Sequence, residues 1–390
     1  MPSLEKCILR KKKTTTAGLD GVTIDDLRSM CPAALSNFVD VFIQAETTGE
    51  WPTQMLAGRV TCLAKVAEPS NALDFRPITV IGLLFRCWGT HHARKAIRFL
   101  DDHLPQGLFG SRPTRYAGQV WSHLLWSIEL AYENDLPLSG IIADIKKAFN
   151  YLPRMVVFEA CAILGIPFPV LLAWAGALAN MPRRFQFHGS ISEPAMSTCG
   201  LPEGCALSCL GMIVIDTLFH KWMLHFFPMC QPLSYVDDWQ IIVTDPHRIQ
   251  GVFACLERFV GELDLLLDAN KTHTWSIQAE ARTTLRGQGF ASVSYSKNLG
   301  AHVQYTRQHT NKTLTARLAT VVPLWIKLRL SASAYRQKVR AILSAAWPRA
   351  MHGIAASTIS QQAFQTLRAG AAKDSKKMAQ AQMHRFSLAS

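Results

Sequence analysis

Apolar positions along the chain alternate between strand-like and helix-like spacing, and this change predicts the elements. Short apolar runs that end in polar turns predict strands near residues 60–63, 78–81 and 141–143. Longer stretches with apolar residues three or four positions apart predict helices at 83–100 and from about residue 312 onward. Both kinds of element are therefore expected, as in an α+β fold.

The clearest strand signal surrounds two adjacent acids, Asp237 and Asp238. Apolar residues flank them at 232–234 and 239–243, which predicts two strands joined by a tight turn. Two carboxylates at the tip of a hairpin repel each other, and burying them is costly unless a cation is present. A divalent metal is the simplest such cation, although an Asp-Asp pair is also ordinary turn chemistry.

Two segments upstream favour the metal-site interpretation of Asp237 and Asp238 over ordinary turn chemistry. Asp144 ends an apolar run, and Phe149 follows it by five positions. A turn with the sequence Gly200-Leu201-Pro202-Glu203-Gly204 then leads, through Ser208, into another apolar run. This order resembles the reverse transcriptases, in which D-x-x-x-x-F/Y, G-x-P-Q-G-x-x-x-S and Y/F-x-D-D follow one another. The resemblance implies a right-hand polymerase with fingers, a palm made of an antiparallel sheet plus helices, and a helical thumb.

Shorter matches extend the resemblance over nearly the whole chain. They are Ala17–Val22, Lys65 with Phe75–Ile78, Gln106–Arg112, Asn270–Thr272 and Leu299–Gly300, and the segment 317–368 is similar to non-LTR retrotransposon polymerases. The resemblance implies fingers over 1–142 with a basic N-terminal segment, and a palm over 143–304 with a helical insertion at 155–198. It also implies a helical thumb-like region with a frayed C-terminus over 305–390.

The resemblance also implies roles for single residues. Asp144 and Asp237 would bridge two Mg²⁺ ions, for which Mn²⁺ can substitute, and Asp238 would complete the site. Lys271 would protonate or neutralise the departing pyrophosphate. Six residues are expected to contact the incoming nucleotide or its template base: Lys65, Arg76, Phe149, Gly200, Pro202 and Gly204. Ser208 is expected to begin the helix behind them. Among these, Lys65 and Arg76 would grip the triphosphate, and Phe149 would clash with a ribose 2′-hydroxyl.

The charge of the chain agrees with a polyanionic partner. The formal net charge is +13, from 41 Lys and Arg against 28 Asp and Glu, although an anionic membrane surface would attract it equally. The expected partners are an RNA template with a DNA primer and deoxynucleoside triphosphates, without a membrane. The stretch 160–179 is uncharged and about long enough to span a bilayer, but Gly165, Pro167 and Pro169 break it into two helices.

The location expected for the protein is intracellular, in the nucleus or the cytoplasm. The N-terminus has no apolar core of a secretion signal. The ten cysteines form no C-x-x-C pair, and we interpret them as small buried hydrophobic residues in a reducing compartment.

Three positions depart from the reverse-transcriptase pattern. Glu203 stands where Gln is usual, Asn150 where Asp is common and Cys209 where Pro is common. The three metal-binding acids remain, so the preferred interpretation is an RNA-directed DNA polymerase from a retroelement. A catalytically decayed nucleic-acid-binding relative is the first alternative, and Glu203 mildly favours it. The second is an RNA-directed RNA polymerase, against which Phe149 argues.

Overall fold

The computed structural model describes residues 7–8, 10–66, 68–187, 189–307, 311–356 and 365. The expected frayed C-terminus falls on residues 357–390, of which only residue 365 is described. Contacts divide the chain into two compact units. Unit 1 comprises Met1–Tyr116, Ile142–Ile241 and Gln250–Thr272, and unit 2 comprises Ala117–Ile141, Ile242–Ile249 and His273–Ser390. The assignment of fingers, palm and thumb to particular ranges stays a prediction.

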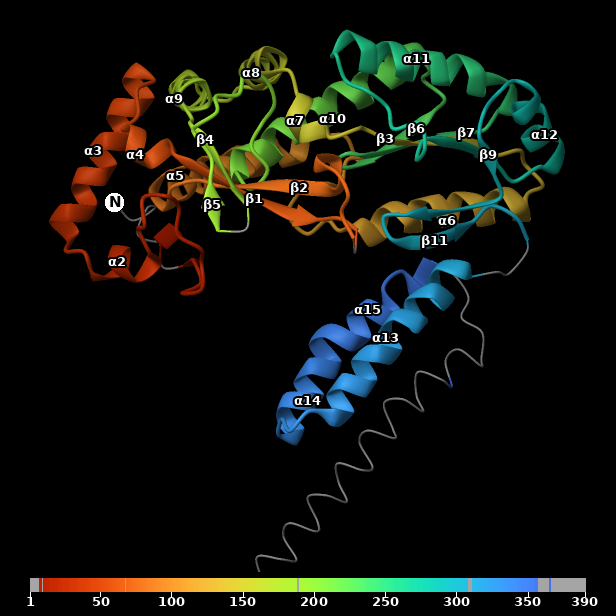
Figure 1. Cartoon of the computed structure of the whole chain (residues 1–390). Coiled ribbons are helices and arrows are strands. Elements are labelled where there is room, and N and C mark those ends of the chain that lie inside the picture. The colour runs from red at the N-terminus through yellow and green to blue at the C-terminus, as the bar shows by residue number, and fades with distance from the viewer. Residues whose placement is uncertain are drawn as a thin grey trace, which may run out of the picture. The chain divides into compact units, whose positions relative to one another are not determined.

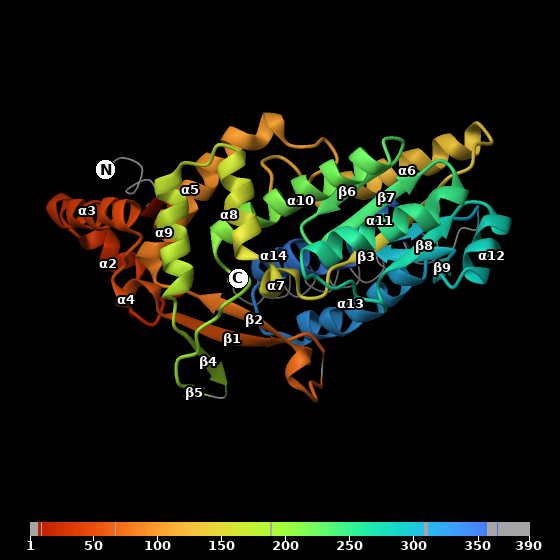
Figure 2. The same cartoon turned by 90° about the horizontal axis from the view of Figure 1, so that it is seen from above.

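Unit 1 contains a four-stranded sheet with the order β2-β1-β4-β5 (Figure 2). Its strands are β1 (Gly58–Ala64), β2 (Phe75–Val80), β4 (Arg183–Phe187) and β5 (Ser190–Ile191). β1 pairs antiparallel with β2 and parallel with β4. The predicted strands near 60–63 and 78–81 are confirmed, whereas the parallel pairing with β4 had no counterpart in the sequence analysis.

Unit 1 also contains a set of helices (Figure 1). The helices before Asp144 are α2 (Ile24–Ser29), α3 (Pro32–Thr48), α4 (Thr53–Leu56) and α5 (Leu83–Leu100). Those after it are α7 (Ala148–Tyr151), α8 (Arg154–Ile163), α9 (Phe168–Ala179), α10 (Ala206–Phe226) and α11 (Ile249–Glu262). Trp51 joins several of them, because its indole N–H donates to Ala173 O at 2.7 Å while its ring meets Trp88 edge-on at 4.9 Å.

The apolar stretch 160–179 forms the two helices α8 and α9, as its glycine and prolines predicted. Within the described part of the chain, one helix, α10, is long and apolar enough to cross a membrane. Burial inside the protein covers 72% of its most apolar stretch, as in the core helix of many folded domains. The expectation of buried cysteines holds for half of the ten, since Cys31 and Cys199 are exposed and three others are partly buried.

A five-stranded sheet has the order β6-β7-β3-β8-β9. It is built from β3 (Ser139–Asp144), β6 (Gln231–Tyr235), β7 (Asp238–Val243), β8 (His273–Ser276) and β9 (Ser292–Val293). β9 runs parallel to β8, because the connection between them crosses through the helix α12 (Ala279–Gly287). The resemblance had implied an antiparallel sheet, and the parallel pair of β8 and β9 is an exception to it.

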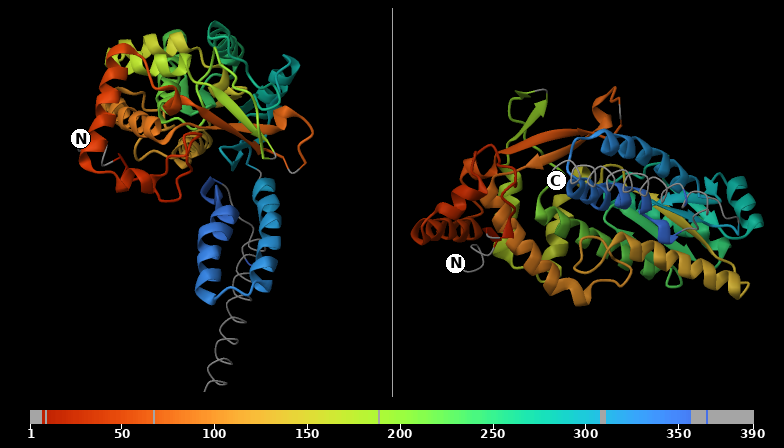
Figure 3. Two further views of the ribbon diagram at one scale, coloured as in Figure 1. Left: turned by 60° about the vertical axis from the view of Figure 1, so that its left-hand side comes forward. Right: turned by 90° about the horizontal axis from the view of Figure 1, so that it is seen from below.

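Unit 2 joins α6 (Ala117–Glu133) and α12 to a hairpin and a group of helices. The hairpin strands β10 (Tyr295–Asn298) and β11 (Ala301–Gln304) are linked by the Leu299-Gly300 turn. The helices α13 (Lys312–Leu330), α14 (Tyr335–Ala341) and α15 (Trp347–Met351) confirm the helical pattern after residue 312 (Figure 3). Val321 and Trp325 of α13 pack with Ala346 and Ala350 in a small apolar core.

Candidate active site

The acids at the centre of the candidate site lie in unit 1, at the ends of two neighbouring strands. β3 ends at Asp144, and Asp237 lies in the two-residue turn between β6 and β7, as predicted. The backbone joins the two segments, because Ile145 N donates to Asp237 O at 3.3 Å. Asp238 begins β7. The fold therefore brings Asp144 to the adjacent pair Asp237 and Asp238, which begins 93 positions further along the chain.

The hairpin tip holds an unusual backbone conformation at Val236. Its φ of 61° lies in the left-handed region, which costs a β-branched residue roughly 1–3 kcal/mol. The segment Gln106–Arg112 supports this tip from behind: Phe109 N donates to Ser234 O, and Ser234 N donates to Gly107 O, both at 2.9 Å. A side chain at Gly110 would collide with Val236 N. This segment therefore holds the strained turn in place.

Negative charge in the site is poorly compensated. Burial raises the pKa of Asp238 to about 7, and the nearby charges of Asp237 and Asp144 add to the rise. Burial also raises the pKa of Asp237, and Asp144 again acts in the same direction. Asp144 and Asp237 are thus near enough to Asp238 for their charges to oppose its ionisation. The site is therefore built to gain stability from a bound cation.

Lys271 supplies one positive charge to these acids. Its Nζ contacts both carboxylate oxygens of Asp144, at 2.8 and 3.0 Å, and lies 3.6 Å from Asp268 Oδ2. Burial lowers the pKa of Lys271, but the hydrogen bond to Asp144 and the negative charges of Asp144, Asp268 and Asp237 together outweigh it, so the pKa is raised. The loop that carries Asp268 and Lys271 is held at the end of β3, because Asp268 N donates to Asp144 O at 2.8 Å. The predicted lysine and the predicted acid are thus direct partners.

The donor set of the site fits a hard divalent ion. No three His, Cys, Asp or Glu side chains converge in a ready-made metal cluster within the described ranges. Instead, Lys271 contacts the carboxylate of Asp144. Carboxylate oxygens are the ligands that Mg²⁺ prefers, and a bound cation would offset the burial that disfavours the ionised forms of Asp237 and Asp238. The residues that could hold an ion are Asp144, Asp237 and Asp238.

Lys65 and Arg76 lie on one face of the four-stranded sheet. The register pairs Leu63 with Arg76, and Lys65 N continues the ladder by donating to Asp74 O at 2.7 Å. Arg76 lowers the pKa of Asp237 and of Glu203, and Lys65 lowers that of Glu203, although burial raises both pKa values more strongly. Of these two exposed cations, Arg76 is therefore within electrostatic reach of Asp237 and Glu203, and Lys65 of Glu203.

Phe149 and Asn150 in α7 adjoin the turn at Gly200–Gly204. Phe149 O accepts a hydrogen bond from Leu201 N at 2.6 Å, and the Phe149 side chain is half-buried instead of lying in the core. Asn150 Nδ2 donates to Glu203 Oε1 at 3.3 Å. Two of the three departures from the reverse-transcriptase pattern are therefore in contact.

The glycines of this turn allow close backbone packing. Gly200 has a φ of 70°, and a side chain there would run into Asn150 O. Gly204 has a φ of 112°, and a Cβ atom there would lie 2.6 Å from Thr79 O. The close approach visible here is to the protein's own backbone, so an approach to a nucleotide stays a prediction.

Ser208 differs slightly from its expected position. α10 begins at Ala206 with Cys205 as its cap, two residues before the predicted start. Ser208 is buried, and its Oγ donates to Pro202 O at 2.9 Å. The serine therefore fixes the turn onto the first turn of the helix.

A buried polar network beneath the hairpin was missed by the sequence analysis. Asp216 of α10 accepts a hydrogen bond from Trp239 Nε1 at 2.8 Å, and His220 Nε2 lies 3.1 Å from Ser234 Oγ. Burial raises the pKa of Asp216 well above its usual range, so the carboxyl is largely neutral. The only sequence signal was an acid in the middle of an apolar helix.

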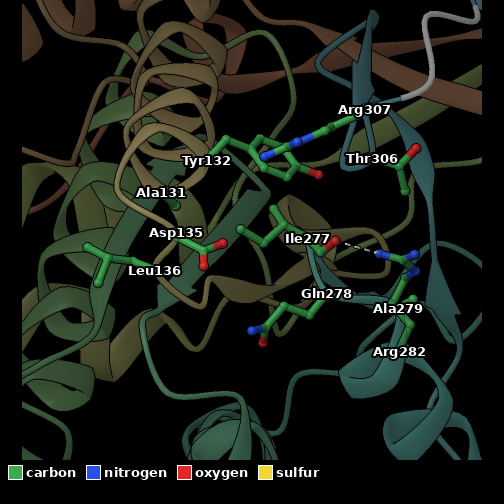
Figure 4. Close-up of a pocket in the computed structure, with 10 residues that line it drawn as sticks. All are labelled: Ala131, Tyr132, Asp135, Leu136, Ile277, Gln278, Ala279, Arg282, Thr306 and Arg307. Carbon is green, nitrogen blue, oxygen red and sulfur yellow. Dashed lines mark hydrogen bonds between the residues drawn. The ribbon is translucent and has the colours of Figure 1, made fainter.

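Unit 2 has a cavity of about 280 Å³ that contains none of the predicted site residues (Figure 4). Two guanidinium groups line it. Arg282 Nη1 donates to Ser276 O at 2.7 Å and to Ile277 O at 3.0 Å, and Arg307 stacks over the ring of Tyr132. Asp135 lines the same cavity. Its arginines are thus partly engaged with the protein itself.

Solved structures similar to this chain include two telomerase structures. The chain is similar to telomerase from Candida tropicalis in complex with the TWJ fragment of telomeric RNA, with 13% identity, a TM-score of 0.50 and 87% of this chain covered. The apo telomerase from the same organism also shares 13% identity over 87% of this chain, with a TM-score of 0.49 and 67% of that chain covered. The match covers 59% of the first telomerase chain. A search of curated proteins finds no match.

The likeness to the telomerase complex supports a right-hand polymerase fold. The family model for reverse transcriptase (RNA-dependent DNA polymerase) matches residues 69–313, which include every acid described above. This chain therefore belongs to the reverse transcriptase family.

Proposed function

We propose that this chain is an RNA-directed DNA polymerase that adds deoxynucleotides to the 3′-hydroxyl of a primer. The observation that carries the proposal is the grouping of Asp144, Asp237 and Asp238, with raised pKa values at the hairpin, beside Lys271 and Arg76. The similarity of 317–368 to non-LTR retrotransposon polymerases supports an origin in a retroelement and an intracellular location, in the nucleus or cytoplasm.

Two Mg²⁺ ions, or Mn²⁺ in their place, would activate the primer hydroxyl and stabilise the leaving pyrophosphate. Asp144 and Asp237 would hold them, and Asp238 would complete the acidic site. Lys271 would have to leave Asp144, whose contact raises its pKa, and could then neutralise or protonate the pyrophosphate. Lys65 and Arg76 would bind the triphosphate.

The direct test is primer extension with dTTP and Mg²⁺ on poly(rA) primed with oligo(dT). The wild type should extend the primer. Asp237→Asn should reduce the rate by at least about a thousandfold, because a site ligand worth several kcal/mol is lost. Asp40→Asn, which changes an exposed acid of α3, is the matched control and should extend normally.

Equal extension by the wild type and Asp237→Asn would reject the assignment of the catalytic acid. No extension by the wild type in either Mg²⁺ or Mn²⁺, with RNA binding retained, would favour the decayed nucleic-acid-binding protein. Both results are read against the Asp40→Asn control, which reports on folding and purity.

A further inference from the structure

Two residues that depart from the reverse-transcriptase pattern touch each other across 53 positions of sequence. Asn150 Nδ2 donates to Glu203 Oε1 at 3.3 Å, and both side chains are half-buried. The pattern has Asp at the first position and Gln at the second. There the amide of Gln could donate and the carboxylate of Asp could accept. Here the amide and the carboxylate have exchanged places, and the two side chains form a hydrogen bond.

The segments that carry this pair are fixed on both sides of it. Leu201 N donates to Phe149 O at 2.6 Å, and Gly200 N donates to Leu152 O at 3.1 Å. The guanidinium of Arg154 adds a bond from its Nε to Gly200 O at 2.9 Å. Because the backbones are held this closely, residues 150 and 203 must be chemically compatible, and two carboxylates there would repel each other.

We propose that Asn150 and Glu203 form a donor–acceptor-inverted pair, so that the two departures are one compensated exchange and not decay. In this pair Glu203 is a positioning residue that sets the Gly200–Gly204 turn against α7. The inference rests on the polymerase function proposed above and concerns how that site takes its nucleotide.

The inversion also moves a negative charge within the site. Glu203 lies within electrostatic reach of Arg76 and Lys65, the two cations expected to bind the triphosphate, whereas the pattern has a neutral amide there. A carboxylate beside these cations competes with the nucleotide's phosphates. We therefore expect the inverted pair to bind deoxynucleotides more weakly than the uninverted pair, by a factor of about two to five.

A double-mutant cycle tests the pair, with Asn150→Asp, Glu203→Gln and the double variant compared with the wild type. The readouts are kcat and KM for dTTP in primer extension, and the melting temperature without nucleotide. Asn150→Asp should reduce kcat/KM at least about fivefold when Glu203 is present, but by less than about twofold in the Glu203→Gln background. The double variant, which has the same net charge as the wild type, should have the lower KM. Glu193→Gln, at an exposed position, is the matched control.

The outcomes separate this inference from the function on which it rests. If Asn150→Asp reduces kcat/KM by the same factor, and the melting temperature by the same number of degrees, in both backgrounds, the pair is not coupled and the inference is wrong. The inference is also wrong if Asn150→Asp prevents folding in both backgrounds. Folding of the double variant where Asn150→Asp alone does not fold would support it. If the wild type extends no primer, the proposed function fails, and the four melting temperatures still decide whether the pair is coupled.

Discussion

At the scale of single residues, Asp238 carries the clearest electrostatic cost in the candidate site. Burial raises its pKa to about 7 from an ordinary value of 3.8. A carboxyl with a raised pKa contributes stability that is fully present below pH 4 and is lost as the pH rises through 7. The wild type should therefore become less stable over this range when divalent ions are chelated.

Asp238→Asn should remove most of that loss. Between pH 5 and pH 8 the free energy of unfolding of the wild type should fall by up to roughly 3 kcal/mol more than that of the variant. Asp237 and Asp216, whose pKa values are also raised, add a further slope that both proteins share and that cancels in the comparison. Urea unfolding with EDTA at the two pH values measures the difference, and parallel slopes would contradict the prediction.

Phe149 determines the second prediction at this scale. If its half-buried ring excludes the ribose 2′-hydroxyl, Phe149→Val should relax the preference for dTTP over UTP by at least about tenfold, mainly through kcat/KM for UTP. Tyr151→Val, in the same short helix, is the matched control and should keep the preference. An unchanged preference in Phe149→Val would return the RNA polymerase alternative to consideration.

The residues found from sequence were those with fixed spacing inside short motifs. Asp144, Asp237 and Asp238 lie where the hairpin and strand patterns predicted, because local alternation determines strand ends. The contact of Lys271 with Asp144 spans 127 positions, and no local pattern encodes such a distance. The resemblance identified the lysine, and only the fold identified its partner.

At the scale of elements, the buried network of Asp216 links α10 to the catalytic hairpin. Asp216→Ala should destabilise the protein by about 2–4 kcal/mol, because it leaves Trp239 Nε1 without an acceptor in a dry interior. Trp239→Phe in the Asp216→Ala background should cost less than in the wild type, since the bond is already lost. Urea unfolding of the four proteins measures the coupling, and strict additivity would contradict it.

Elements were easier to predict than their partners. The boundaries of α5 and the break between α8 and α9 follow from helical spacing and from Gly165, Pro167 and Pro169. The sequence did not predict that β4 pairs in parallel with β1, or that β9 pairs in parallel with β8. Strand pairing depends on tertiary packing, which cannot be predicted from the β-propensity of single residues or from the spacing of apolar positions.

At the scale of the whole molecule, the charge of +13 should make RNA binding strongly dependent on salt. Affinity for a single-stranded RNA should fall at least about tenfold between 50 and 200 mM salt, because phosphate contacts release counterions. Fluorescence anisotropy with labelled RNA measures it. Asp237→Asn should give the same affinity and slope, because template binding rests on many separate contacts. A flat salt dependence would contradict an RNA-binding role.

The parallel contact of β1 with β4 has a consequence for how the chain folds during synthesis. Gly58 pairs with Arg183, so 125 further residues must be synthesised after Gly58 before its partner exists. At typical rates of translation this takes roughly 6–25 s. During that interval β1 has only β2 beside it, and its other edge is a template for pairing with foreign strands. The nascent chain should therefore depend on chaperones that cover strand edges until β4 is made.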